Sequence, residues 1–95
     1  MLIRIVRMTF KEDSVDDFLE IFRENSDQIK ACNGCVDLEL LRDLDNPNVF
    51  ITKSRWINQS LLEDYRNSEF FKTTWQKTKP LFSEKPLAFS SEKYL

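Results

Sequence analysis

The chain has 95 residues, of which 41% are hydrophobic and 32% are charged, and its formal net charge is −2. This length suits one domain over residues 1–95, with a core small enough that self-association would help to stabilise it. The slightly acidic balance argues against a general nucleic-acid binder, which needs a basic face, and the apolar runs are too short to span a membrane.

The lack of histidine and the lack of a secretory signal reduce the number of function classes that fit this sequence. The chain contains no histidine, which removes the commonest general base near neutral pH and the commonest metal ligand. Catalysis through a histidine triad is therefore excluded within this chain. The N-terminal residues have arginines within their apolar run and no small-residue cleavage site, so we expect no secretory signal and a cytoplasmic protein.

The N-terminal part of the sequence predicts a strand followed by a helix. Residues 2–10 alternate with apolar side chains on both faces, as in a strand that is covered on both sides. Ser14 and Asp17 resemble a capping box, and we expect the helix to end near Cys32, with Gly34 in the left-handed conformation. The apolar stripe of this helix comprises Val15, Phe18, Leu19, Phe22 and Ile29.

The middle of the sequence predicts an antiparallel hairpin. Residues 35–44 alternate, with Val36, Leu38 and Leu40 on one face. A turn-rich segment follows, and residues 48–56 then form a third strand that places Phe50, Thr52 and Trp56 on one face. Two strands joined by so short a turn favour pairing with each other.

The C-terminal part predicts two short helices and a final strand. Asn58 and Ser60 are candidate N-caps of a helix that ends near Arg66, and Asn67 with Ser68 marks a break before the next helix. Pro80 ends that second helix. Its inner stripe comprises Phe70, Phe71, Thr74, Trp75 and Thr78. Residues 87–89 form a weaker strand at an edge of the sheet.

The predicted order of strand, helix, strand, strand, helix and strand is the ferredoxin-like βαββαβ arrangement of the α+β class. Its antiparallel sheet carries the helices on one face. Because the first and third strands are apolar on both faces, the opposite face of the sheet needs a cover as well. A second copy of the chain is the simplest cover, so we expect a homodimer.

The stretch after the third strand reads Trp56-x5-Leu62-x2-Tyr65-x2-Ser68-x2-Phe71-Lys72-x2-Trp75. With the strand order, this run resembles the antibiotic biosynthesis monooxygenase (ABM) superfamily, the dimeric α+β barrels, which also include haem-degrading enzymes. The resemblance covers nearly the whole chain. It implies a monooxygenase that needs no cofactor and acts on a small aromatic or quinol-like metabolite, which is itself deprotonated and gives an electron to oxygen.

The resemblance to the haem-degrading enzymes does not extend to their chemistry. Trp56 matches their cavity tryptophan, but Trp75 stands at the position of the histidine that binds iron. Val6 stands at the position of their asparagine. Since two of the three residues that define that chemistry are missing, we expect no haem degradation.

We identify Trp56, Tyr65, Phe71 and Trp75 as candidate walls of a substrate cavity, and Arg4 as a candidate partner for an anionic substrate. Each residue also has a simpler interpretation. The two tryptophans would serve as core residues, and Tyr65 would lie at the rim of the core. Arg4 would pair with a carboxylate across a subunit interface. The catalytic residues themselves are not identified by the sequence.

The remaining motifs indicate no metal site. Cys32 and Cys35 form a C-x-x-C, but at the C-terminal end of a helix, where the helix dipole opposes a thiolate. We expect free, unreactive thiols, and we interpret the acidic residues of the first helix as a solvated face. The alternative to a monooxygenase is a ligand-binding or structural dimer without catalytic activity, whose cavity is filled by its own side chains.

Overall fold

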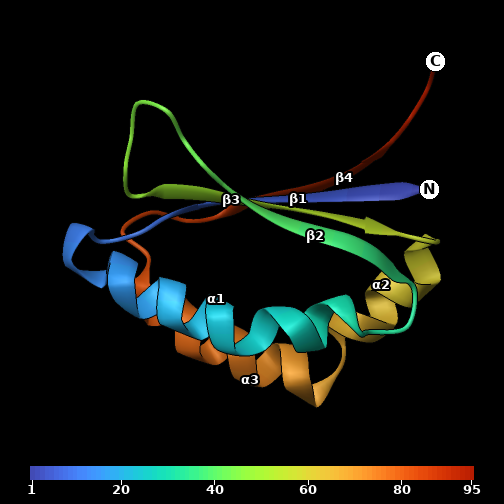
Figure 1. The fold of residues 1–95 in the computed structure, drawn as a ribbon, viewed down its shortest axis with the longest axis horizontal. Helices are drawn as coiled ribbons and strands as arrows, with labels where there is room; N and C mark the ends of the chain where they lie inside the picture. The colour runs from blue at the N-terminus through green and yellow to red at the C-terminus, as the bar shows by residue number, and fades with distance from the viewer.

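The computed structural model covers residues 1–95 and contains a four-stranded sheet with the helices packed against one face (Figure 1). The strands are β1 (Leu2–Thr9), β2 (Cys35–Arg42), β3 (Val49–Trp56) and β4 (Leu87–Glu92), in the spatial order β2-β3-β1-β4. All three strand pairs are antiparallel. This topology confirms the predicted ferredoxin-like α+β fold.

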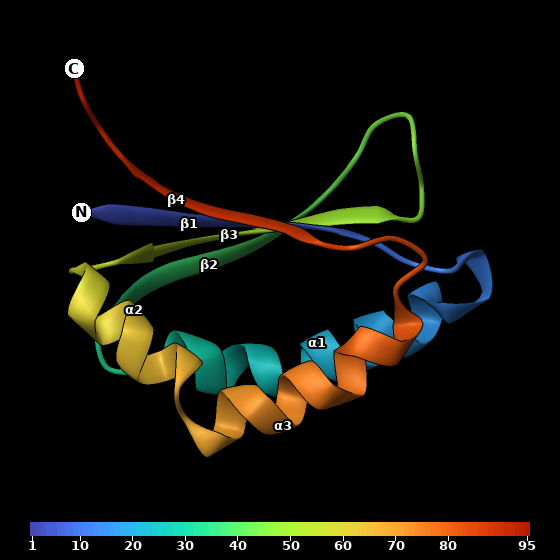
Figure 2. The same ribbon diagram turned by 180° about the vertical axis from the view of Figure 1, so that it is seen from behind.

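The helices are α1 (Val15–Lys30), α2 (Gln59–Arg66) and α3 (Glu69–Thr78), with short 3₁₀ turns at Glu12–Ser14 and Lys79–Leu81. Seen from behind, all three helices lie below the same face of the sheet, and the opposite face carries no element (Figure 2). None of the helices is both long enough and apolar enough to cross a membrane.

The register of the two central strands decides which side chains face the helices. β1 pairs with β3 so that Arg4 lies opposite Ser54, Val6 opposite Thr52 and Met8 opposite Phe50. Met8 and Phe50 belong to the buried cluster that includes Phe18 of α1, so the even-numbered residues of β1 point toward the helices, since side chains alternate along a strand. The odd-numbered residues point to the other face, as the sequence pattern predicts.

Two side-chain caps determine how the chain passes through the second helical segment. Asn58 caps α2 by accepting a hydrogen bond from the backbone N–H of Leu61 at 2.9 Å. Ser68 caps α3 by accepting from the backbone N–H of Phe71 at 3.1 Å, and its hydroxyl donates to the carbonyl of Tyr65 at 2.6 Å. Ser68 thus fixes both the end of α2 and the start of α3, as predicted for the Asn67–Ser68 break.

The predicted capping box at the start of α1 is wrong. Ser14 is the N-cap residue but makes no capping hydrogen bond, and its hydroxyl instead donates to the carboxylate of Asp13 at 3.4 Å. The 3₁₀ turn at Glu12–Ser14 has already bent the chain, with the backbone N–H of Ser14 bonded to the carbonyl of Lys11. Ser14 therefore lacks the extended backbone that brings a capping side chain to the helix N–H groups.

The connection from α1 to β2 also differs from the prediction in detail. The helix ends at Lys30 rather than at Cys32, and Gly34 takes the expected positive φ, at 90°. A bulge between Cys35 and Asp37 shifts the register of β2, so that Val36 is 44% exposed and does not share a face with Leu38. The extra residue of a bulge is left unpaired, and this breaks the simple alternation.

The hydrophobic core lies toward one end of the sheet. Met8, Phe10, Phe18 and Phe50 form its buried cluster, and the Phe10 and Phe18 rings stack with centroids 4.1 Å apart. Trp56, the other fully buried large side chain, lies at the opposite end of β3. The space between this cluster and Trp56 forms the cavity described next.

Candidate functional site

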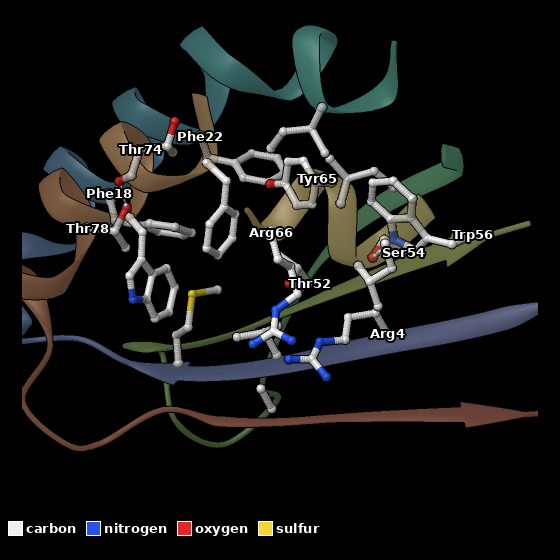
Figure 3. A pocket seen from close by; sticks show the side chains of 18 residues that line it. Arg4, Phe18, Phe22, Thr52, Ser54, Trp56, Tyr65, Arg66, Thr74 and Thr78 are labelled. Atoms are coloured by element: carbon white, nitrogen blue, oxygen red, sulfur yellow. Dashed lines mark hydrogen bonds between the residues drawn. The ribbon is translucent and has the colours of Figure 1, made fainter. Parts of the chain in front are cut away.

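A cavity of about 250 Å³ lies between the inner face of the sheet and the helices (Figure 3). Side chains of all four strands line its sheet side, most of them from β1 and β3, and side chains of α1, α2 and α3 line its opposite side. For comparison, a 150 Å³ apolar cavity accommodates benzene. The space is therefore large enough for a ligand of more than one ring, and most of its lining is hydrophobic, as is usual for small-molecule sites.

The structure brings all five residues proposed from the sequence to this one cavity: Arg4, Trp56, Tyr65, Phe71 and Trp75. They come from β1, from the end of β3, and from α2 and α3. Phe70, which the sequence places on the same inner stripe as Phe71, does not line the cavity. Its ring instead lies beside Tyr65, with centroids 6.5 Å apart.

Trp56 is both a core residue and a wall residue. Its side chain is fully buried, and its indole N–H donates to the hydroxyl of Ser54 at 2.9 Å. The face of its ring stacks on Tyr65, with centroids 5.1 Å apart. Because Ser54 satisfies its only donor, Trp56 offers a ligand apolar contact rather than a hydrogen bond.

The aromatic wall continues from Tyr65 along α3. The Tyr65 and Phe71 rings meet edge to face at 5.1 Å, and the Phe71 and Trp75 rings stack at 5.9 Å with an interplanar angle of 13°. Trp75 is only partly buried, and its indole N–H makes no hydrogen bond within the chain. The wall thus runs from a rigid buried end at Trp56 to a more accessible end at Trp75 that retains a free donor.

Tyr65 is a neutral phenol in this cavity. Burial raises its pKa well above the usual range, and the nearby Cys32 and Cys35 raise it further. The phenol can therefore donate a hydrogen bond to a ligand but cannot act as a base near neutral pH. The other ionisable residues of the cavity are two arginines, so neither a carboxylate nor an imidazole lines it.

These two arginines are Arg4 on β1 and Arg66 at the end of α2. Arg4 donates to the hydroxyl of Ser90 at 3.1 Å, and Arg66 pairs with Glu63 at 3.0 Å. Burial and the adjacent charge of Arg66 lower the pKa of Arg4, while the charge of Glu63 raises it. Within the chain, Arg4 has a hydroxyl partner but no salt bridge to a carboxylate.

Sequence reasoning missed several residues of this site. Arg66 follows the buried Leu62 by four positions, so helical spacing already places it on the inner face of α2. Thr52 shares a strand face with the candidate wall residue Trp56, as strand alternation predicts, but its place opposite Val6 depends on the register between β1 and β3. Thr74 and Thr78 belong to the predicted inner stripe of α3, but their hydroxyls bond to carbonyls of their own helix.

The two cysteines lie outside the cavity lining, and both thiols are free. Burial raises the pKa of Cys32 and of Cys35, which disfavours the reactive thiolate. The structure contains no cluster of three or more cysteine or acidic residues that could hold a metal ion.

The fold and the cavity together define a ferredoxin-like α+β protein with a ligand-sized space under its helices. The chain belongs to the family of the antibiotic biosynthesis monooxygenases, since residues 1–77 match the model of that family. No curated protein sequence is significantly similar to the chain.

The chain is similar in fold, at low sequence identity, to several solved structures. A crystal structure of an antibiotic biosynthesis monooxygenase superposes with a TM-score of 0.93 at 18% identity, over 100% of both chains. The structure of a conserved protein from Methanosarcina mazei Go1 superposes with a TM-score of 0.92 at 19% identity, over 99% of this chain and 94% of the other. The structure of Rv0793 from Mycobacterium tuberculosis superposes with a TM-score of 0.90 at 14% identity, over 98% of this chain and 94% of the other. Such low identities establish a shared fold alone.

Proposed function

We propose that this protein is a homodimeric monooxygenase that binds a small aromatic or quinol-like metabolite and oxygenates it without a cofactor. The observation that carries the proposal is the 250 Å³ cavity with its continuous aromatic wall, in a chain of the monooxygenase family. The cavity is not filled by the protein's own side chains, which argues against the alternative of a self-filled core.

The proposed reaction takes its electrons from the substrate. A quinol-like ring can present, in its keto form, a CH₂ group next to a carbonyl. Two C–H bonds and the O–O bond break, while one oxygen atom forms a new C=O and the other leaves as water. The first step is loss of a proton from the CH₂ group, and the resulting carbanion gives an electron to oxygen.

The residues of the cavity supply binding and shielding for this chemistry but no base. The aromatic wall would hold the ring and exclude water from the reactive carbanion. No carboxylate or imidazole is present to take the proton, and Tyr65 stays protonated. We therefore expect the substrate to lose this proton to water as it enters the cavity, before the wall encloses the ring, and Arg4 and Arg66 to bind the negative charge of the substrate.

A second candidate function is ligand binding without catalysis. The absence of a base from the cavity lining favours it, because binding needs only the aromatic wall. Both functions predict saturable binding of an aromatic ligand, and only the first predicts consumption of oxygen.

The experiment titrates the protein with a panel of quinols and flavonoids and follows tryptophan fluorescence. We expect saturable quenching, because Trp56 and Trp75 both line the cavity. Phe71→Ala should weaken binding roughly 3- to 10-fold, as for loss of one aromatic contact. Phe70→Ala is the matched control, since this neighbour on the same helix does not line the cavity and should leave binding unchanged.

Oxygen uptake then separates the two functions. For each ligand that binds, one O₂ consumed per product formed supports the monooxygenase. Binding without any uptake above a buffer control supports the non-catalytic alternative. A lack of quenching across the panel at any concentration would overturn both.

A further inference from the structure

One end of the cavity has a charge arrangement that an apolar ligand alone does not explain. The side chains of Arg4 and Arg66 enter the cavity from opposite sides, one from the sheet and one from α2, and their guanidinium groups point toward each other (Figure 3). Placing two cations together in a partly buried site is unfavourable, and the charge of Arg66 accordingly disfavours the charged form of Arg4.

The carboxylates of the chain compensate only part of this charge. Glu63 pairs with Arg66 three residues away on the exposed side of α2. Arg4 has only the hydroxyl of Ser90 as a hydrogen-bond partner. Two guanidinium groups therefore share one carboxylate, and one positive charge at this end of the cavity is not neutralised by the chain.

A polar group of the sheet adds to this end of the cavity. Thr52 lies opposite Val6 on the neighbouring strand, two residues from Ser54, which lies opposite Arg4, and its side chain lines the same cavity as both arginines. Its hydroxyl makes no hydrogen bond within the chain and so remains available as a donor. The cavity thus presents two guanidinium groups and a hydroxyl, while most of its remaining lining is aromatic or aliphatic.

We propose that the natural ligand is an aromatic carboxylate, with its ring against Tyr65, Phe71 and Trp75 and its carboxylate between Arg4, Arg66 and Thr52. This inference rests on the proposed function, because it assumes that the cavity binds a small aromatic molecule. To that function it adds the class of the substrate, an aromatic carboxylate. A planar carboxylate matches the fork of an arginine through two parallel hydrogen bonds, and its charge neutralises the excess positive charge.

The test compares a matched pair of probes, 2-naphthoate and 2-naphthalenemethanol, which share a ring system and differ in charge. Tryptophan quenching at pH 7 gives both dissociation constants. We expect wild-type protein to bind the acid roughly 10- to 100-fold more tightly than the alcohol, as for hydrogen bonds to a charged group. Arg66→Gln and Arg4→Gln should each remove most of that preference and leave the affinity for the alcohol unchanged.

Two further variants make the test specific. Arg66→Lys keeps the charge but loses the fork, so it should retain only part of the preference. Arg23→Gln removes an exposed arginine of α1 that does not line the cavity, and it should bind both probes as the wild type does. Circular dichroism of each variant checks the fold, and the wild-type comparison of acid with alcohol needs no variant at all.

The outcomes distinguish this inference from the function on which it rests. If the alcohol binds as tightly as the acid, or if the arginine variants weaken both equally, the anionic subsite is wrong and the aromatic cavity stands. If neither naphthalene probe binds and the quinol and flavonoid panel gives no quenching either, the proposed function fails and this inference fails with it. Preference for the acid that is lost in both glutamine variants supports the subsite.

Discussion

Tyr65 is the cavity residue whose chemistry the fold changes most. Its ring lies between Trp56 and Phe71, and burial there raises its pKa. A group with a raised pKa in the folded state keeps its proton while the unfolded chain loses it. Stability that is fully present below about pH 10, the ordinary pKa of tyrosine, is therefore lost as the pH rises above it.

This loss of stability at high pH leads to a prediction for Tyr65→Phe. The variant cannot ionise at this position, so its free energy of unfolding should fall less steeply than that of the wild type above about pH 10. The difference in slope should not exceed about 1.4 kcal/mol per pH unit, the limit for one proton. Urea unfolding of both proteins between pH 8 and pH 11 measures it. Parallel curves over that range would show that Tyr65 is not buried as described.

The five candidate residues show how much of the site the sequence could predict. Phe71 and Trp75 follow from helical spacing, and Trp56 and Tyr65 follow from the family resemblance. The sequence could not predict that Arg4 and Arg66 line the same cavity, because residues so far apart in the sequence are brought together only by the packing of α2 against the sheet. Local periodicity shows which face of an element a residue is on, but it does not show what lies opposite that face.

At the scale of the element, Gly34 links α1 to the start of α2. Its φ of 90° is unfavourable for residues with a side chain, and its carbonyl accepts a hydrogen bond from the backbone N–H of Ile57 at 2.9 Å. A Cβ atom at this position would lie 2.6 Å from the Cβ of Leu61. The turn and the first turn of α2 thus pack too closely for any other residue.

Gly34→Ala should therefore destabilise the protein by about 2–4 kcal/mol, the sum of backbone strain and overpacking. Gly34→Asn should not restore stability, although asparagine tolerates a positive φ, because its Cβ meets Leu61 as well. Urea unfolding measures both variants. A loss below about 1 kcal/mol for alanine, or a clear advantage for asparagine, would show that the contact with Leu61 is not decisive.

Element types were predictable, and element ends were less so. Asn58 and Ser68 have the side chains and the spacing of caps, and both form the expected bonds. Ser14 has the same chemistry but makes no capping hydrogen bond, because the preceding residues already form a turn and Ser14 lacks the backbone conformation of a cap. The predicted face of Val36 is wrong because a single extra residue in β2 changes which face of the sheet its side chain occupies. Both errors arise from backbone geometry that the local residue pattern does not encode.

At the scale of the whole molecule, the uncovered face of the sheet carries an exposed apolar patch. Leu87 and Phe89 on β4 are 58% and 47% exposed, and they lie beside Arg7 and Ile5 of β1. On the same face, Arg55 of β3 donates to the carboxylate of Asp37 on β2 at 2.8 Å. A patch of apolar side chains framed by such polar groups is typical of a protein interface.

We expect this face to pair with the same face of a second copy, as a two-fold symmetric dimer requires. Light scattering after gel filtration should therefore give twice the chain mass at micromolar concentration. Phe89→Glu places a charge within the apolar patch and should yield a monomer, because burying an unpaired carboxylate costs far more than the lost ring contributes. Leu44→Glu is the matched control: it lies in the loop before β3, is fully exposed, and should remain a dimer. A wild-type monomer, or a Phe89→Glu protein that still forms the dimer, would show that the two sheets do not pack face to face.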